Sequence, residues 1–377
     1  MTAGPDRPRV LHVYKDYYPP VMGGIETTIN LMARGTADAF EPSVLVCAGA
    51  GDAGVAMIDG VRVRRIQEWR RFSGAPVAPA FVQALREEAA RADIIHLHHP
   101  NPTGDVAILL SGVKTPTVMT YHSDIVRQRF TRILFAPVQH WSMGRCAVIM
   151  PTSPQYLESS RWLRRYREKC EIVPLGIELR RFKKTPAMVE ARDALKRAHP
   201  GKLIVFVGRL RYYKGLEFLL KAMVGLPATL LIGGTGGDEE RLRRLAVDMA
   251  NVRFLGDLSE QQLVALLHAA DIFCMPSHLR SEAFGLSMVE AMACGKPVVS
   301  ARLDTGVCFV NRDGVSGVNV EPASAPALHD ALAKLLHDDA LRARLGHGAI
   351  SRAQARFSAE DMCEAVISVY RKVLERA

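Results

Sequence analysis

Short apolar runs that alternate with helical patterns constrain this chain more than any other feature of its sequence. Runs of strand length, rich in Val, Ile and Leu, lie at residues 9–14, 42–49, 92–99, 115–122 and 146–153. Such runs are typical of strands buried on both faces, and the helical stretches between them favour parallel strands. The first half of the chain therefore predicts a doubly wound α/β domain.

The same pattern starts again near residue 200. Further apolar runs lie at residues 201–210, 228–234, 252–258, 271–277 and 297–301. Because 377 residues are too many for one ordinary core, we predict two Rossmann-like domains, residues 1–180 and 190–357. The polar stretch from about 178 to 190, interrupted by Pro186, is interpreted as the linker. Ligands of open α/β sheets bind at the carboxyl ends of the strands, so we expect the domains to face each other across a ligand-binding cleft.

The end of the chain reads as one amphipathic helix. Ser358 is a suitable N-cap residue. One face of the helix carries Met362, Val366, Val369, Tyr370 and Val373. This apolar face must pack against another part of the protein.

The net charge of +10 is concentrated in the first half of the chain. Residues 1–185 carry 25 Lys and Arg against 17 Asp and Glu, whereas residues 186–377 carry 24 against 22. A basic surface attracts nucleic acid, anionic lipid or anionic small molecules. The seven cysteines are scattered without a CxxC pair, and the sequence has neither a signal peptide nor an apolar run long enough to span a bilayer. These features favour a protein of the cytosol.

The stretch "DIFCMPSHLRSEAFGLSMVEAMACGKPVVSA" (271–301) predicts a strand, a loop, and a helix from about 286 to 294. Free backbone N–H groups at Phe284, Gly285 and Leu286 are expected to bind a phosphate at the helix N-terminus. Glu282 in the loop and Glu290 in the helix would bind hydroxyl groups of a ribose or a hexose. The alternative is that Glu282 only caps the helix and Glu290 is an exposed helix acid.

The stretch "VFVGRLRYYKGLEFLL" (205–220) places two cations at the same predicted sheet edge. Arg209 offers a planar fork and Lys214 a point charge, a combination that suits a diphosphate. No Asp-x-Asp pair occurs in the sequence to hold a metal ion, so these cations would stabilise the leaving diphosphate themselves. Alternatively, both are ordinary surface charges.

The first domain offers weaker signals. Gly23 and Gly24 precede a predicted helix and can form a backbone nest for an anion. His122 follows a predicted strand and would bond a sugar or a phosphate, or be a loop histidine without a role. The three histidines at 96, 98 and 99 lack a Cys or an acid at ligand spacing, so we predict no metal site.

Arginines alternate with apolar residues in "SDIVRQRFTRILFAPVQHWSMGR" (123–145), and "SSRWLRRYREK" (159–169) adds further cations. Val126, Phe130, Ile133, Leu134, Pro137 and Trp141 share helical spacing in the first of these stretches. One interpretation is a helix that packs on its own core. The other is a basic amphipathic surface that rests on anionic lipid.

Four segments together resemble a known family. "GGIE" at 23–26, "PLGIELRRF" at 174–182, "GRLRYYKG" at 208–215 and "SEAFGLSMVEAMACGKPVV" at 281–299 are similar to the GT-B glycosyltransferases of family 4, the retaining enzymes with a Glu-x7-Glu motif. The segment "LHVYKDYYPPVMGGIE" at 11–26, together with "YHSDIVRQR" at 121–129, further resembles bacterial O-antigen mannosyl- and rhamnosyltransferases that use GDP-sugars. The resemblance implies a GT-B fold, in which residues 358–377 cross back to the first domain and residues 190–357 bind the donor.

The resemblance also implies a role for each motif residue. Glu282 would hold hydroxyls of the transferred sugar and Glu290 the ribose, while His122 would position the sugar. The remaining donor-binding residues would be Gly23, Gly24, Arg209, Lys214, Leu258 near the base, Phe284, Gly285 and Leu286. The loop before Glu282 is longer than is usual in the family. This departure from the family pattern affects the side of the site that would face the sugar.

The function expected from this resemblance is retaining transfer of a hexose, with mannose from GDP-mannose favoured, to a saccharide acceptor that is lipid-linked. We expect neither a cofactor nor a metal, no nucleic acid partner, and a cytoplasmic protein whose basic first domain contacts the inner face of an anionic membrane. The alternatives are a UDP-sugar-dependent transferase, a nucleotide-sugar epimerase, and a non-catalytic carbohydrate- or lipid-binding protein.

Overall fold

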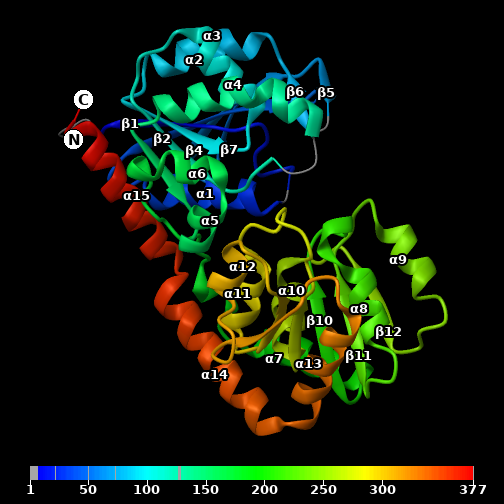
Figure 1. Ribbon diagram of the computed structural model, residues 1–377. Coiled ribbons are helices and arrows are strands. Elements are labelled where there is room, and N and C mark those ends of the chain that lie inside the picture. The colour runs from blue at the N-terminus through cyan, green and yellow to red at the C-terminus, as the bar shows by residue number, and fades with distance from the viewer. Residues whose placement is uncertain (1–6, 22, 50, 73, 126–128, 377) are drawn as a thin grey trace. The chain divides into compact units, whose positions relative to one another are not determined.

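Two parallel sheets organise the chain in the computed structural model (Figure 1). It describes residues 7–21, 23–49, 51–72, 74–125 and 129–376, with only the backbone at 129–134. Close contacts divide the chain into two units, which we call unit 1 (residues 1–176 and 359–377) and unit 2 (residues 177–358). The domain limits expected from the sequence were 1–180 with 358–377, and 190–357.

The sheet of unit 1 has the strand order β3-β4-β2-β1-β7-β8-β9, and only β3 runs antiparallel to its neighbour. Its strands are β1 Arg9–Val13, β2 Glu41–Ala48, β3 Gly54–Ile58, β4 Val61–Gln67, β7 Ile94–His99, β8 Thr117–Tyr121 and β9 Val148–Pro151. The order reverses between β1 and β7, and ligands of doubly wound sheets bind at such a switch point.

Helices cover both faces of this sheet. One layer contains α2 Ala80–Ala89, α3 Pro102–Ser111 and α4 Arg129–Arg145, and the other contains α1 Gly24–Gly35, α5 Pro154–Ser159, α6 Arg161–Arg165 and α15 Ala359–Leu374 (Figure 1). A short 3-10 turn follows α6 at Arg167–Lys169. No helix among the described residues is both long and apolar enough to cross a bilayer.

The predicted terminal helix is confirmed as α15. All five residues of its predicted apolar face are buried, and the helix packs against α1 in unit 1. The two helices approach so closely that a Cβ atom on Gly35 would lie 2.3 Å from Sγ of Cys363.

The sheet of unit 2 is parallel throughout, with the order β12-β11-β10-β13-β14-β15. Its strands are β10 Lys202–Val207, β11 Ala228–Gly233, β12 Val252–Gly256, β13 Ile272–Met275, β14 Val298–Ala301 and β15 Gly317–Val320. This is the Rossmann order, and its switch point lies between β10 and β13. Both sheets agree with the predicted fold class.

One helical layer of unit 2 contains α8 Leu216–Ala222 and α13 Ala325–His337, which share an apolar core with the sheet. The other contains α7 Pro186–Ala198, α10 Glu260–Ala269 and α11 Leu286–Ala293. The remaining helical segments are α9 Glu239–Leu245, α12 Gly306–Val310, α14 Asp339–Arg356 and two 3-10 turns, η2 Leu179–Phe182 and η3 Tyr212–Lys214.

The interpretation of 178–190 as a polar linker is wrong, because this stretch is helical and belongs to unit 2. It forms η2 and the start of α7. Pro186 begins α7 instead of breaking the chain, because proline at the first helical position loses no hydrogen bond. The side chain of Thr185 caps this helix by accepting from the backbone N–H of Met188.

Two hairpins of unit 1 were not predicted. The strands β3 and β4 form one, and β5 Arg70–Phe72 with β6 Ala75–Val77 form the other. The strand β4 reads "VRVRRIQ", and its arginines hide the strand pattern in the sequence. They are accommodated because Glu88 on α2 forms ion pairs with Arg62 and Arg64.

Gly215 brings the loop after β10 against the loop after β13. Its φ of +70° lies in the left-handed region, and a Cβ atom there would lie 2.2 Å from the carbonyl oxygen of Pro276. Gly225 has a similar φ of +80°, but a Cβ atom there meets nothing within 4 Å. A substitution at Gly225 would therefore meet backbone strain alone, whereas one at Gly215 would meet backbone strain and a steric clash.

We expect Gly225→Ala to lower the free energy of unfolding by about 1 kcal/mol, which is the cost of a left-handed alanine. Gly215→Ala carries the same strain and a clash with backbone, so it should cost at least about twice as much. Chemical denaturation of both variants measures the difference. Equal losses would show that the two loops do not depend on this close approach.

Candidate active site

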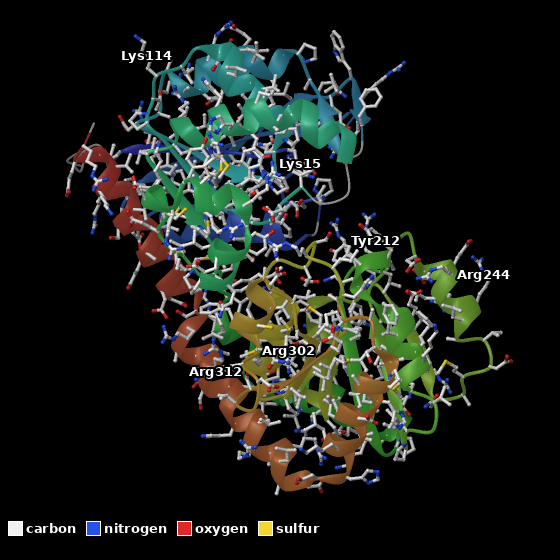
Figure 2. All side chains as sticks on the ribbon, viewed as in Figure 1. Lys15, Lys114, Tyr212, Arg244, Arg302 and Arg312 are labelled. Carbon is white, nitrogen blue, oxygen red and sulfur yellow. The ribbon has the colours of Figure 1, made fainter. Side chains whose placement is uncertain are left out.

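The candidate site of unit 2 lies at the carboxyl ends of β10 and β13. These strands are neighbours in the sheet, so the loops that follow them start side by side. The loop after β10 contains Gly208, Arg209 and the turn η3, whose Tyr212 is labelled in Figure 2. The loop after β13 runs from Pro276 to Gly285, which is the N-cap residue of α11.

Lys214 and Glu282 form a buried ion pair across these two loops. Nζ of Lys214 lies 2.6 Å from Oε2 of Glu282, and the two residues are only 8% and 7% exposed. The hydroxyl of Ser277 donates to the same oxygen at 2.8 Å. Burial alone would lower the pKa of Lys214, but the carboxylate of Glu282 outweighs it and raises the pKa overall.

The backbone around Glu282 is held from two sides. The N–H of His278 donates to the carbonyl of Tyr213 at 3.0 Å, which ties the loop to η3. The hydroxyl of Thr305 donates to the carbonyl of Glu282 at 2.8 Å. These bonds fix where the carboxylate points.

Sequence reasoning predicted Lys214 and Glu282 but not the residues that orient Glu282. Ser277 is the second residue after β13, and Thr305 lies between β14 and α12. A signal for Ser277 existed, since it is the first hydroxyl residue after a buried strand. Thr305 comes from a different loop, and nothing local marks it.

The N-terminus of α11 lies next to this pair. The helix begins at Leu286, as predicted, after Gly285 with a φ of +89°. A Cβ atom on Gly285 would lie 2.6 Å from Cε of Met288 and 3.3 Å from Sδ of Met275, so only glycine fits. The N-terminus of such a helix favours anions.

The prediction for Phe284 concerns its backbone N–H group, and its side chain packs elsewhere. It is buried, and its ring packs edge-on against Phe357 at 5.8 Å between centroids. Its side chain belongs to an aromatic cluster with Phe357 and Phe309. Any contact of Phe284 with a ligand must therefore come from its backbone.

Glu290 lies in the second turn of α11 and is half-buried. Burial raises the pKa of its carboxyl to about 7, and the positive charge of Arg181 opposes this rise. A carboxyl with this pKa is partly protonated at neutral pH. It can therefore accept or donate a hydrogen bond, depending on pH.

Glycines build the rest of this sheet edge. Cβ atoms on Gly234 and Gly236 would lie 2.3 Å from the carbonyl oxygens of Gly208 and Leu210, respectively. The sequence "GGTGG" at 233–237 thus allows close backbone packing beside Arg209, a role that sequence reasoning missed. Leu258 packs against the first of these glycines, with Cδ1 2.5 Å from where a Cβ atom on Gly233 would lie.

The other three predicted site residues belong to unit 1. Gly23 has extended backbone and caps α1, which begins at Gly24. His122 follows β8, is 3% exposed, and bonds through Nε2 to Nδ1 of His98 at 3.1 Å. All three lie beyond the carboxyl ends of β1 and β8 in their own sheet.

The predicted basic stretch at 123–145 lies partly outside the described residues. Val126 and Arg127 are not described, nor are the side chains of 129–134. The described part forms α4, where Gln139, Ser142 and Met143 are buried and Trp141 is 37% exposed. The helix packs against α3.

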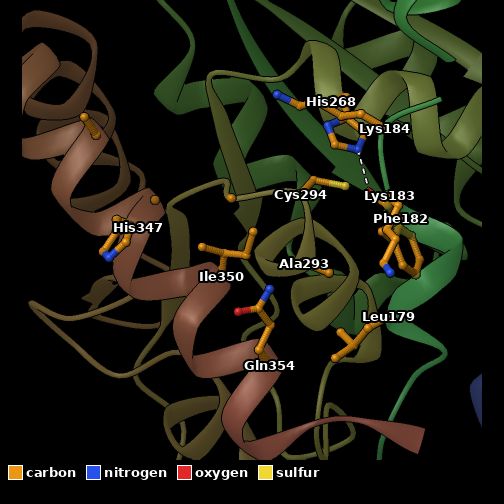
Figure 3. A pocket seen from close by; sticks show the side chains of 13 residues that line it. Leu179, Phe182, Lys183, Lys184, His268, Ala293, Cys294, His347, Ile350 and Gln354 are labelled. Atoms are coloured by element: carbon orange, nitrogen blue, oxygen red, sulfur yellow. Dashed lines mark hydrogen bonds between the residues drawn. The ribbon is translucent and has the colours of Figure 1, made fainter. Parts of the chain in front are cut away.

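A cavity of about 740 Å³ lies at the opposite end of α11, next to η2 and α14 (Figure 3). Its wall includes Phe182, Lys184, His268, Cys294 and Ile350. None of the predicted site residues lines it. The cavity is therefore separate from the edge that carries Lys214 and Glu282.

Two family models match the chain. The "Glycosyl transferases group 1" model matches residues 189–352, and the "Glycosyl transferase 4-like domain" model matches residues 23–176. The match boundaries follow the division into unit 2 and unit 1.

Curated relatives match over nearly the whole length. O-antigen chain mannosyltransferase C of Escherichia coli is 32% identical over 97% of this chain and 99% of its own. D-rhamnosyltransferase WbpZ of Pseudomonas aeruginosa is 33% identical over 93% of this chain and 92% of its own.

Solved structures share the fold. Sucrose-phosphate synthase from Thermosynechococcus elongatus has a TM-score of 0.84 at 23% identity and covers 98% of this chain and 100% of its own. The Anabaena protein HepE in complex with UDP has a TM-score of 0.77 at 20% identity, with 97% and 100% covered. The chain therefore belongs to the group 1 glycosyltransferases, family 4, and has the GT-B fold.

Proposed function

We propose that this glycosyltransferase transfers a hexose with retention of configuration, and that its donor is GDP-mannose. The observation that carries the proposal is the buried ion pair of Lys214 and Glu282 beside the N-terminus of α11. The names of the relatives, a mannosyltransferase and a rhamnosyltransferase of O-antigen type, favour mannose or a related sugar.

The diphosphate of the donor would bind to Lys214, Arg209 and the N-terminus of α11. The ammonium of Lys214 has three N–H groups, of which one donates to Glu282, so it can also donate to a phosphate. Arg209 is exposed at the end of β10, and the paired N–H groups of its planar guanidinium suit phosphate oxygens. Because these groups supply positive charge, the proposal needs no metal ion.

The two glutamates would bind the two sugars of the donor. Oε2 of Glu282 accepts from Lys214 and Ser277, whereas Oε1 has no hydrogen-bonding partner among the described residues. This second oxygen can accept from a hydroxyl of the transferred hexose. Glu290 would accept from the ribose hydroxyls, Leu258 would border the base, and the Gly23–Gly24 turn would cover the diphosphate.

Retention follows if the acceptor attacks on the face that the diphosphate leaves. The bond between the anomeric carbon and the phosphate oxygen breaks, and the bond to the acceptor oxygen forms. The proton of the acceptor hydroxyl passes to the departing phosphate oxygen, so no protein base is needed. The protein stabilises the charge that develops on the diphosphate, and His122 would position the hexose.

The acceptor is proposed to be a lipid-linked saccharide at the cytoplasmic face of an anionic membrane. Unit 1 has an apolar surface, which we call the apolar face, made of exposed residues of α3 and of the β5–β6 hairpin. It comprises Trp69, Phe72, Val77, Val106, Leu109 and Leu110. The hairpin packs on α3, where the hydroxyl of Thr103 donates to the carbonyl of Pro76.

Cations accompany the apolar face. Arg70 in the hairpin is exposed, and so is Lys114, which projects beyond α2 and α3 (Figure 2). Exposed Trp and Leu with nearby cations are typical of surfaces that rest on anionic lipid. The first half of the chain also carries an excess of positive charge.

The transferase proposal is tested by incubating the purified chain with GDP-mannose, other GDP-sugars and UDP-sugars, and measuring released nucleotide. We expect slow hydrolysis that is fastest with GDP-mannose. Arg209→Ala should lower kcat/KM about 10- to 100-fold, the value of one or two charge-assisted hydrogen bonds. Arg244→Ala, an exposed arginine on α9, is the control and should behave like the wild type.

Other outcomes of this assay contradict parts of the proposal. Fastest release from a UDP-sugar would reassign the donor base. Conversion of a donor to its epimer without nucleotide release would identify an epimerase. No reaction with any of these donors would refute the transferase assignment of this site.

The role of Glu290 predicts a pH dependence. Only the ionised carboxylate can accept from both ribose hydroxyls, and with a pKa of about 7 the ionised fraction rises about tenfold from pH 6 to 8. GDP should therefore bind up to about tenfold more tightly at pH 8 than at pH 6, beyond the effect of its own phosphate.

Binding of 2′-deoxy-GDP provides the reference, because both ligands have the same titrating phosphates. We expect the affinity ratio of GDP to 2′-deoxy-GDP to rise with pH in the wild type and to stay flat in Glu290→Gln. Isothermal titration calorimetry measures both. A flat ratio in the wild type would remove Glu290 from the ribose site.

The membrane proposal is tested by sedimentation with vesicles that contain anionic phospholipid. We expect the double variant Trp69→Ser and Phe72→Ser to bind at least about tenfold more weakly, because Trp69 and Phe72 are 75% and 62% exposed. The control is Val224→Ser with Val247→Ser, which removes equally exposed apolar side chains from unit 2. Equal binding of both double variants would refute the assignment of the apolar face.

A further inference from the structure

The cavity between η2, α14 and the C-terminal end of α11, which we call the α11 cavity, has a wall of apolar side chains. Phe182 of η2 is buried in this wall. Leu179, Ala293 and Ile350 also line it and are half-buried. Figure 3 shows Ile350 of α14 projecting toward α11. The volume of about 740 Å³ lies within the range of small-molecule sites, roughly 300–1,000 Å³.

The mouth of the α11 cavity carries positive charge. Lys183, Lys184 and His347 line the cavity and are exposed. Neither lysine has an ion-pair partner among the described residues. The described residues that line the cavity include no Asp and no Glu. A ligand that pairs with these cations must therefore supply the negative charge itself.

The charge of Lys184 also acts on buried groups behind the wall. Burial lowers the pKa of His268, and the charges of Lys296 and Lys184 lower it further. Burial lowers the pKa of Lys296 to about 8, and Lys196 and Lys184 add to this effect. Asp271 opposes it, but already pairs with Lys196 at 3.1 Å. Positive charge therefore exceeds negative charge here, and a bound anion would relieve the repulsion.

The backbone at this end of α11 offers no N–H group to an anion. Gly295 ends the helix with a φ of +71°. The N–H groups of Gly295 and Lys296 donate to the carbonyls of Met292 and Ala291, at 2.9 and 3.1 Å. The C-terminus of a helix also disfavours negative charge. An anionic group must therefore be held by side chains at the mouth, and the part of a ligand that lies against α11 must be uncharged.

A reactive thiol is the competing explanation, because Cys294 lines the cavity and is 8% exposed. Burial raises the pKa of this thiol to about 12, although the charge of Lys296 opposes the rise. The thiolate is the nucleophile, so a thiol with this pKa is unreactive at neutral pH. The α11 cavity is therefore suited to binding and not to covalent chemistry.

We propose that the α11 cavity binds a small amphiphilic anion, with its hydrocarbon part against Phe182 and Ile350 and its carboxylate or phosphate at Lys183 and Lys184. A neutral hydrocarbon would leave both lysines unpaired, and an inorganic anion would leave the apolar wall in water. The α11 helix has 8 residues, so this site lies roughly 12 Å from the helix N-terminus at Gly285. The inference concerns a second site and does not rest on the proposed donor or acceptor.

Methyl spectra of the full chain labelled with ¹³C-isoleucine test the location, because Ile350 lines the cavity. Ile350→Val assigns the signal. We expect decanoate to shift the Ile350 signal in a saturable way and to leave that of Ile232, buried in the sheet, unchanged. The absence of a saturable Ile350 shift with both decanoate and decyl phosphate would overturn the proposal.

Matched ligands test the chemistry of the occupant. Decanol has the chain of decanoate without the charge, and acetate has the charge without the chain. Each should bind at least about tenfold more weakly than decanoate. Equal binding of decanol and decanoate would refute the anionic part of the proposal. Whichever of decanoate and decyl phosphate binds more tightly identifies the anionic group, and either result supports the site.

Two double variants test the role of the lysines. Lys183→Gln with Lys184→Gln should weaken decanoate binding at least about tenfold, the value of one or two charge-assisted hydrogen bonds. The control, Lys221→Gln with Lys334→Gln, removes two exposed lysines from α8 and α13 and should behave like the wild type. Calorimetry measures both affinities, and equal affinities would overturn the proposal.

A competition experiment tests whether the α11 cavity is separate from the edge that carries Lys214 and Glu282. We expect decanoate to shift the Ile350 signal equally with and without saturating GDP. Displacement of decanoate by GDP would show that one ligand occupies both places, and would overturn the assignment of a second site.

Discussion

The ion pair between Lys214 and Glu282 is the contact on which the loops at the carboxyl edge of the sheet of unit 2 depend. It connects the loops after β10 and β13, which are adjacent because the Rossmann strand order reverses there. The close approach at Gly215 brings the two loops within reach of each other. Removal of either partner would leave the other charge buried and unpaired, which is strongly destabilising. The position of each loop is therefore coupled to that of the other.

The switch points of the two sheets carry different kinds of buried polar group. At the switch point of unit 2, the buried groups are charged, and each charge has a partner. At the switch point of unit 1, the buried groups are imidazoles that burial keeps neutral, and they bond to one another. A charged group can stabilise a diphosphate, whereas a neutral imidazole can only offer a hydrogen-bond donor or acceptor. This difference favours the proposal that the donor binds mainly to unit 2.

Strands buried on both faces and the glycine-bounded helix α11 could be predicted from the sequence, because their apolar runs and turn residues are local signals. Lys214 and Glu282 could be predicted because each follows a strand end. The strand β4 could not, because its arginines obscure the apolar pattern and the pairing with Glu88 on α2 that accommodates them is not a local signal. The contact between His12 and His98 was missed because the two residues are 86 apart in the sequence, and only the strand register brings them together. Pro186 was misread because proline begins helices as readily as it ends them.

The buried pair is also the basis of the role that we propose for Glu282. A buried ion pair is a poor source of stability, since apolar residues of similar volume often stabilise a fold as well or better. Here the pair has a second consequence: Lys214 and Ser277 hold one carboxylate oxygen, and the other is left fixed in direction. A hydroxyl that binds there meets an acceptor that is already oriented, so little conformational entropy is lost on binding. The same bond holds the ammonium of Lys214 in place, so in the proposed function one contact orients both the group for the hexose and the group for the phosphate.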